Sequence, residues 1–154
     1  MADQESEKTR VDRELIEFLN ELRLALPGVQ VLLAFLLIVP FSERFATLDA
    51  AQKRVYLTAV ITSALSSVLL IAPAVQHRLR FRRVDKAQLI AVSTVFAVVG
   101  TALLAVAIGA SVHLVTGFIF AARAAAVVAA MVTGVAVLTW FVTPLFYRGS
   151  PHRD

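Results

Sequence analysis

Four long stretches of the chain consist almost entirely of apolar residues, and short polar segments separate them. About 18 consecutive apolar residues already make a transmembrane helix candidate, because such a helix crosses the hydrocarbon core of a bilayer. The pattern therefore predicts an all-α integral membrane protein, a four-helix transmembrane bundle. We expect a transmembrane domain over residues 24–147, with spans at about 24–42, 55–75, 88–110 and 118–141.

Prolines bound the first of these spans. Pro27 stands at its entrance and Pro40 near its exit, and proline is tolerated at the start of a helix but not in its interior. The helix core is therefore predicted at about 29–39. In the polar connection 43–54, Thr47 is the predicted N-cap of the second helix, because its hydroxyl can accept a hydrogen bond from an unpaired backbone N–H group.

The third and fourth spans come from one continuous stretch, residues 87–147, which contains a single charged residue, Arg123. As one helix, these 61 residues would be about 90 Å long, whereas the hydrocarbon core is about 30 Å thick. The stretch must therefore fold back on itself. We expect the turn at 109–117, which contains two glycines and a serine; a turn close to Arg123 is the alternative and leaves the number of spans unchanged.

The first 23 residues differ in composition from the rest, with seven acidic and four basic residues. Apolar residues recur there at helical spacing, and Thr9 with Asp12 matches a capping box. We therefore predict a cytoplasmic N-terminal segment, 1–23, that forms an amphipathic helix from about Arg10. Its polar face is mostly acidic, which favours docking on the protein's own basic loop over binding to anionic lipid.

Composition supports a membrane protein and excludes several other classes. Of the 154 residues, 58% are hydrophobic and 17% are charged, and the mean hydropathy is +0.77, whereas a soluble domain has about a quarter of its residues charged. The absence of cysteine excludes disulfide scaffolds, thiolate metal sites and cysteine nucleophiles. Nucleotide-binding, zinc-protease and hydrolase motifs are missing as well. We therefore expect no enzyme activity, no cofactor and no metal.

The distribution of lysine and arginine predicts the orientation in the membrane. If both termini are cytoplasmic, the inner segments, including the cytoplasmic tail 148–154, carry eleven of these residues and the outer segments carry four. Cytoplasmic segments are normally the richer in lysine and arginine. We expect a multi-pass protein of the bacterial plasma membrane with both termini in the cytoplasm.

Three polar residues in or near the spans are candidates for intramembrane polar contacts or for transport: Gln30, His113 and Arg123. The spans contain no Asp or Glu, the residues that usually carry protons or sodium ions in transporters. For each candidate a structural interpretation is favoured. Gln30 would bond a neighbouring helix, His113 would be solvated in the turn, and Arg123 would anchor the first turn of the fourth span.

The loop between the second and third spans, residues 77–86, is the most basic stretch of the chain. Bases beside a membrane attract anionic headgroups, although orientation by the positive-inside rule is the simpler interpretation. No fold or aromatic platform for nucleic acid accompanies the basic loop. The candidate headgroup-binding residues are Arg78, Arg80, Arg82 and Arg83.

Small residues recur at four-residue intervals along three of the spans, a pattern that lets helices approach closely in lipid. We expect this pattern to serve helix packing, and the third row to lie either inside the bundle or at an interface between copies. The three rows are Ala59, Ser63 and Ser67; Thr101, Ala105 and Gly109; and Ala122, Ala126, Ala130 and Gly134.

Several segments together resemble a family of small bacterial four-span membrane proteins, grouped as a domain of unknown function. The segments are DRELIEFLNELRLALPGVQ at 12–30, VPF at 39–41 and IAP at 71–73, the last followed by His77 and Arg78. The resemblance covers about residues 10–145. It implies a multi-pass membrane protein and assigns no functional residues. Some members carry the label sodium:proton antiporter, although this chain lacks the intramembrane carboxylates that such antiporters use.

The sequence thus predicts a non-enzymatic scaffold or accessory subunit of the inner membrane. We expect it to contact anionic lipid headgroups and to bind a second copy or another membrane protein. A small cation or proton transporter or channel is the alternative, because four short spans and three polar candidates suit that class. A third hypothesis is a lipid-binding module that uses the arginines of the basic loop.

Overall fold

The computed structural model describes residues 20, 26–80 and 86–143, and within these ranges all regular structure is helical. A first helix, Leu26–Phe41, ends in the short 3-10 helix η1, Val39–Phe41. The longer helices are α2, Ala50–Arg80, α3, Lys86–Ile119, and α4, Ala122–Val137. The 3-10 helix η2, Glu43–Thr47, precedes α2, and the π-helix η3, Leu138–Val142, continues α4. The predicted all-α fold with four helices is confirmed, and the predicted amphipathic helix at 10–23 lies outside the described residues except for Asn20.

Three of the four helices are long and apolar enough to cross a membrane. Their apolar parts are Ala50–Gln76, Ala91–Ile119 and Ala122–Val142. The fourth, the Leu26–Phe41 helix, is apolar but shorter. At 1.5 Å per residue it extends for about 24 Å, which is less than the hydrocarbon core of about 30 Å.

The turn between α3 and α4 lies at Phe120 and Ala121, so the predicted turn at 109–117 is wrong and the alternative close to Arg123 is right. The N–H of Phe120 still donates to the carbonyl of Thr116 over 2.8 Å, and the extended backbone of Ala121 then reverses the chain. The glycines of the expected turn serve helix packing instead. A Cβ at Gly109 would collide with Oγ1 of Thr133, and one at Gly117 would touch Ala125, so both glycines let α4 approach α3.

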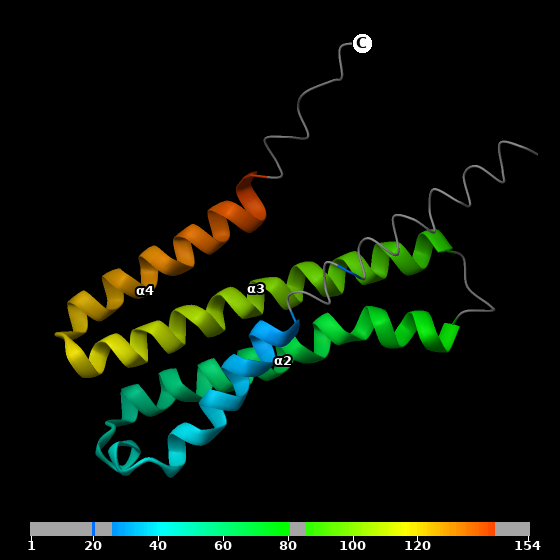
Figure 1. Ribbon diagram of the computed structural model, residues 1–154. Helices are drawn as coiled ribbons and strands as arrows, with labels where there is room; N and C mark the ends of the chain where they lie inside the picture. The colour runs from blue at the N-terminus through cyan, green and yellow to red at the C-terminus, as the bar shows by residue number, and fades with distance from the viewer. Residues whose placement is uncertain (1–19, 21–25, 81–85, 144–154) are drawn as a thin grey trace, which may run out of the picture.

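The helices form a thin bundle rather than a closed one. Antiparallel α2 and α3 make a central pair, the Leu26–Phe41 helix lies across this pair, and α4 lies along α3 (Figure 1). Among the described elements α4 contacts α3 but not α2. The ends of all four helices that meet near residues 42–54 and 118–123 are called the Asp49 end below.

Two apolar clusters join the Leu26–Phe41 helix to the central pair. One, at the Asp49 end, consists of buried residues from all three helices and from the connection between the first two: Leu36, Leu48, Tyr56, Ala59 and Leu114. The second consists of Val29, Leu70 and Ala97. Between α2 and α3 the helices come close at Gly100, whose carbonyl accepts a hydrogen bond from Oγ of Ser66 over 2.8 Å.

The exit of the first helix depends on one tyrosine. Pro40 has no N–H group, so the carbonyl of Leu36, four residues earlier, lacks its helical partner. The hydroxyl of Tyr56 on α2 donates to that carbonyl over 2.9 Å, and the ring of Tyr56 stacks edge-on with Phe45 at a centroid distance of 5.1 Å. This contact fixes the helix end that the proline creates.

The rows of small residues have two different environments. Ala59, Ser63 and Ser67 are buried on α2. On α3, Ala105 and Gly109 are buried as well. The row on α4 is different, because its three alanines, Ala122, Ala126 and Ala130, are exposed and the space beside Gly134 is open.

Candidate functional site

A cavity of about 180 Å³ opens at the Asp49 end between the starts of α2 and α4, with the last third of α3 as its floor. The elements that surround it meet only because α3 continues to Ile119 and turns there. Six of its nine lining residues are apolar or glycine. The lining comprises Asp49, Ala51, Gln52 and Val55 from the start of α2, His113, Leu114 and Gly117 from α3, and Ala122 and Ala125 from α4.

Asp49 and Gln52 are held in place by a reciprocal cap on α2. The Oδ1 atom of Asp49 accepts the backbone N–H of Gln52 over 2.8 Å, and the N–H of Asp49 donates to Oε1 of Gln52 over 3.0 Å. This is the capping-box arrangement, in which two unpaired donors at a helix start are satisfied together. The second carboxylate oxygen of Asp49 and the Nε2 group of Gln52 take no part in the cap.

Asp49, and not Thr47, is therefore the N-cap of α2. The hydroxyl of Thr47 instead donates to the carbonyl of Arg44 over 2.7 Å, within η2. The prediction failed because the connection winds into the 3-10 helix η2, which moves the start of α2 two residues further along the chain. A sequence signal was present, since Asp49 and Gln52 are three residues apart directly before an apolar run.

His113 lies within α3 and is partly buried, so the predicted position in a turn is wrong. It lines the cavity together with Asp49 and Gln52. An imidazole, a carboxylate and an amide therefore line the same cavity. Among these residues, no group of three or more His, Cys, Asp or Glu could hold a metal ion.

The structure does not unite the three polar candidates. Arg123 lies in the first turn of α4 and is exposed at the Asp49 end, but it is not among the residues that line the cavity. Gln30 is exposed on the first helix, beside Val29, which packs against Leu70 in the second apolar cluster. The proposed roles of Gln30, His113 and Arg123 stay predictions.

The four arginines of the basic loop are only partly within the described residues. Arg78 and Arg80 lie in the last turns of α2, whose side chains there are not described, and Arg82 and Arg83 lie outside the described residues. Their binding of lipid headgroups also stays a prediction.

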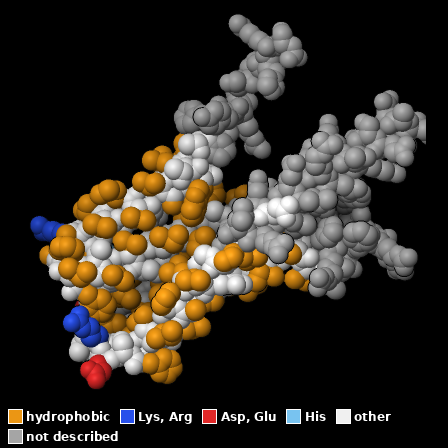
Figure 2. Space-filling view, in the orientation of Figure 1, with side chains coloured by type: hydrophobic (Ala, Val, Ile, Leu, Met, Phe, Trp, Pro, Cys, Tyr) orange, Lys and Arg blue, Asp and Glu red, His pale blue; other side chains and the backbone are white. Residues whose placement is uncertain are grey.

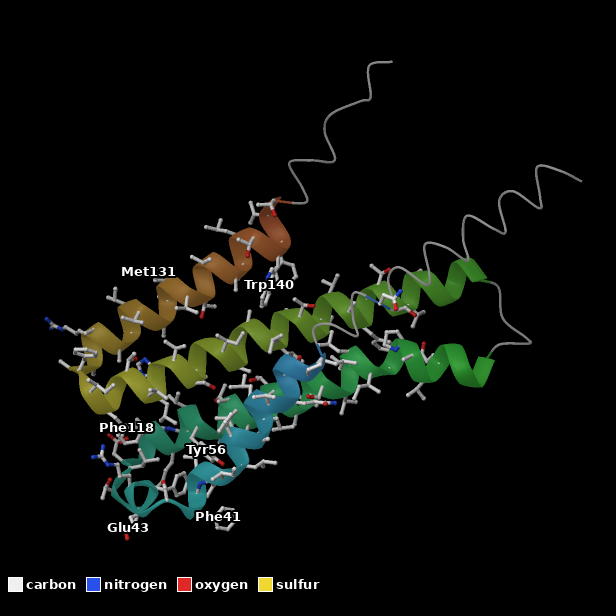
Figure 3. All side chains as sticks on the ribbon, in the orientation of Figure 1. Phe41, Glu43, Tyr56, Phe118, Met131 and Trp140 are labelled. Atoms are coloured by element: carbon white, nitrogen blue, oxygen red, sulfur yellow. The ribbon has the colours of Figure 1, made fainter. Side chains whose placement is uncertain are left out.

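Apart from Arg78 and Arg80 at the end of α2 and Lys86 at the start of α3, the charged residues of the described segments gather at the Asp49 end. Figure 2 shows Lys, Arg and acidic side chains at that end, while the rest of the face that is coloured by residue type is apolar or uncharged. Exposed aromatic rings accompany these charges, among them Phe41 and Phe118, and Phe41 points away from the bundle (Figure 3). Aromatic rings are typical of the interface between membrane and water. The cavity therefore lies at the level where an apolar surface gives way to a charged one.

No curated protein and no solved structure matches the chain. One family model matches residues 4–144, that of a family of unknown function, DUF6328. This match includes every helix described above and the segments on which the sequence resemblance rests. The protein therefore belongs to the DUF6328 family.

Proposed function

We propose that the protein is a non-enzymatic scaffold or accessory subunit of a membrane assembly, located in the bacterial plasma membrane with both termini in the cytoplasm. The observation that supports this proposal is the one-sided packing of α4. Its buried residues are Ala125, Ala129 and Ala136, and among the long helices it contacts α3 alone. The opposite side of α4 has no neighbour within the described chain.

The flank of α4 between its α3 contact and this free side has the composition of a helix contact. Ala126 and Ala130 are exposed there, four residues apart, and Ala122, one turn earlier, is exposed as well but lines the cavity at the Asp49 end. In lipid, helices associate through van der Waals packing and not through the hydrophobic effect, so small side chains that permit close approach favour association. A helix of a second copy, or of a partner membrane protein, could approach α4 closely along this row.

The test is the assembly state in lipid nanodiscs made directly from membranes. We expect the wild-type protein to be recovered as an oligomer or with a partner at fixed stoichiometry. Replacing Ala126 and Ala130 by Leu should reduce that assembly, because the larger side chains keep the helices apart. The matched control replaces exposed Val127 and Val135 by Leu. A monomer without a partner in every gentle preparation would contradict the proposal.

A small cation or proton transporter is the second candidate, and the cavity favours it. Both His113 and Asp49 line the cavity. Asp49 is the acidic residue closest to the second span, since no other Asp or Glu follows it in the sequence until Asp85. The α2–α3 contact leaves no room for a path from this cavity across the membrane, because a Cβ on Gly100 would lie only 3.0 Å from Leu70. This tight contact makes transport the weaker of the two candidates.

Ion flux into liposomes separates the two candidates. Vesicles loaded with wild-type protein should show no proton or sodium flux above empty vesicles if the protein is a scaffold. Flux that is lost in His113→Ala or Asp49→Asn, and kept in Glu43→Gln, would establish transport. Glu43 is a suitable control because it is an exposed acid at the same end that does not line the cavity.

A further inference from the structure

The cavity at the Asp49 end combines a carboxylate with apolar walls. Asp49 is the only charged residue among those that line it. The capping pair holds its Oδ1 atom on the N–H of Gln52, so the orientation of the carboxylate is set before any ligand arrives. Asp49 is exposed, so its carboxylate stands at the mouth of the cavity in contact with solvent. A carboxylate held there attracts a cation and repels an anion.

The basic residues nearby do not line the cavity. Successive residues of a helix are rotated by about 100°, so Lys53 lies opposite the side of α2 that carries Ala51, Gln52 and Val55, and Arg54 lies at the edge of that side. By the same spacing Arg123 points away from the side of α4 that carries Ala122 and Ala125. All three basic residues are exposed, as is Asp49, so solvent screens each of the four charges. Asp49 is the one of the four that lines the cavity.

The hydrogen-bonding groups suit a primary ammonium better than a quaternary one. A primary ammonium has three N–H donors, the carboxylate of Asp49 is an acceptor, and an imidazole ring such as that of His113 offers a nitrogen acceptor. A quaternary ammonium donates no hydrogen bonds and is typically recognised by aromatic rings. No aromatic residue is among the lining residues of this cavity.

The size and position of the cavity suit an ammonium group with an apolar attachment. A dry cavity of about 150 Å³ admits a molecule the size of benzene, so about 180 Å³ accommodates a short organic group as well as its charge. The walls formed by Val55, Leu114 and Ala125 can contact that attachment. The neighbouring charges and aromatic rings place the cavity at the level of the lipid headgroups.

We propose that this cavity binds a primary ammonium group carried on an apolar chain at the membrane boundary, with Asp49 as the counter-charge. The ammonium can come from a lipid headgroup such as phosphatidylethanolamine or from a free amphipathic amine, because both present the same group at this depth. The proposal does not depend on the scaffold function, because binding requires Asp49, whereas the assembly test changes Ala126 and Ala130, which do not line the cavity.

The first experiment is calorimetric titration of the full chain in a neutral detergent with hexylammonium. Binding should weaken at least about tenfold in Asp49→Asn, a loss of about 1.4 kcal/mol, and less than about twofold in Glu43→Gln. Asparagine is as good an N-cap as aspartate, so Asp49→Asn keeps the helix start. The comparison between variants also cancels the partition of the amine into the micelle. Equal binding to wild type and Asp49→Asn would overturn the proposal.

A second variant and two probes test the rest of the site. Ala51→Leu should weaken hexylammonium binding by filling the cavity while the carboxylate stays in place. Hexyltrimethylammonium should bind at least about tenfold more weakly than hexylammonium. Binding of hexanoate in preference to hexylammonium, or equal binding of both ammonium probes, would overturn the proposal.

Native mass spectrometry distinguishes the two sources of the ammonium. Protein from mixed nanodiscs should retain phosphatidylethanolamine over phosphatidylcholine, and Asp49→Asn should lose this preference, if the source is a lipid. Hexylammonium binding without such a preference would assign the site to free amines. If neither phosphatidylethanolamine nor hexylammonium depends on Asp49, the proposal is wrong.

Discussion

Asp49 has two chemically separate roles in this structure. As the N-cap of α2 its Oδ1 atom satisfies the N–H of Gln52, and as a lining residue it brings a negative charge to the cavity. The first role needs only an oxygen acceptor, whereas the second needs the charge. Substitutions that differ in only one of these properties therefore separate folding from binding.

We predict that Asp49→Ala lowers the free energy of unfolding by about 1 kcal/mol, because the helix start loses its capping acceptor. Asp49→Asn should change the free energy of unfolding by only a few tenths of a kcal/mol while weakening ammonium binding. Reversible unfolding in mixed micelles, followed by circular dichroism, gives both values. If Asn destabilised as much as Ala, the stabilisation would come from the charge rather than from the hydrogen bond.

Tyr56 shows how one side chain repairs a defect that a proline introduces. We predict that Tyr56→Phe lowers the free energy of unfolding by about 1–3 kcal/mol, because the buried carbonyl of Leu36 then loses its donor. In a Pro40→Ala background the restored N–H can reach that carbonyl, so the same substitution should cost less. A double-mutant cycle measures the difference. Equal costs in both backgrounds would mean that the hydroxyl and the proline are energetically independent.

At the scale of elements, the α3–α4 pair depends on glycines that look like turn residues in the sequence. We predict that Gly109→Ala lowers the free energy of unfolding by about 1–3 kcal/mol through overpacking against Thr133. Thr133 is β-branched and has few alternative rotamers in a helix, so it cannot easily move aside. Gly134→Ala on α4 is the control, since nothing lies within 4 Å of its added Cβ.

A second substitution, at Thr133, should restore the stability that Gly109→Ala removes. Thr133→Ala removes the colliding oxygen, so Gly109→Ala should be tolerated in that background. Thermal unfolding of the four variants in one detergent compares them directly. A loss of stability at Gly134 as large as that at Gly109 would show that the effect is not due to the α3–α4 contact.

These elements mark the limits of prediction from sequence. Helix type and number follow from the apolar runs, because only a helix satisfies its backbone within lipid. The position of the last turn does not follow, because a glycine such as Gly109 in an apolar run fits a turn or a close helix contact equally well. Which of the two roles the glycine has depends on the residue that it contacts on another helix. The sequence shows His113 as a polar residue in an apolar run, but it does not show that Asp49 and Gln52 line the same cavity, because that depends on α3 continuing past 109–117.

At the scale of the whole molecule, the open question for topology is the Leu26–Phe41 helix. If all four helices cross the membrane, residues at the two ends of the chain lie on the same side, whereas a non-crossing first helix places them on opposite sides. The described part of this helix covers only about 24 Å, but Asn20 is helical as well. The distribution of lysine and arginine favours four crossings.

The absence of cysteine makes this question directly measurable, because any single introduced cysteine is the only thiol in the chain. We predict that Ser42→Cys and Arg123→Cys react with an impermeant maleimide added to intact cells, since both residues are exposed at the Asp49 end. Ser6→Cys and Ser150→Cys should react only after the membrane is opened. Labelling of Ser6→Cys in intact cells, with Ser150→Cys protected, would mean that the first helix does not cross. The Asp49 cavity would then still face outward, because its position depends on α2, α3 and α4 alone.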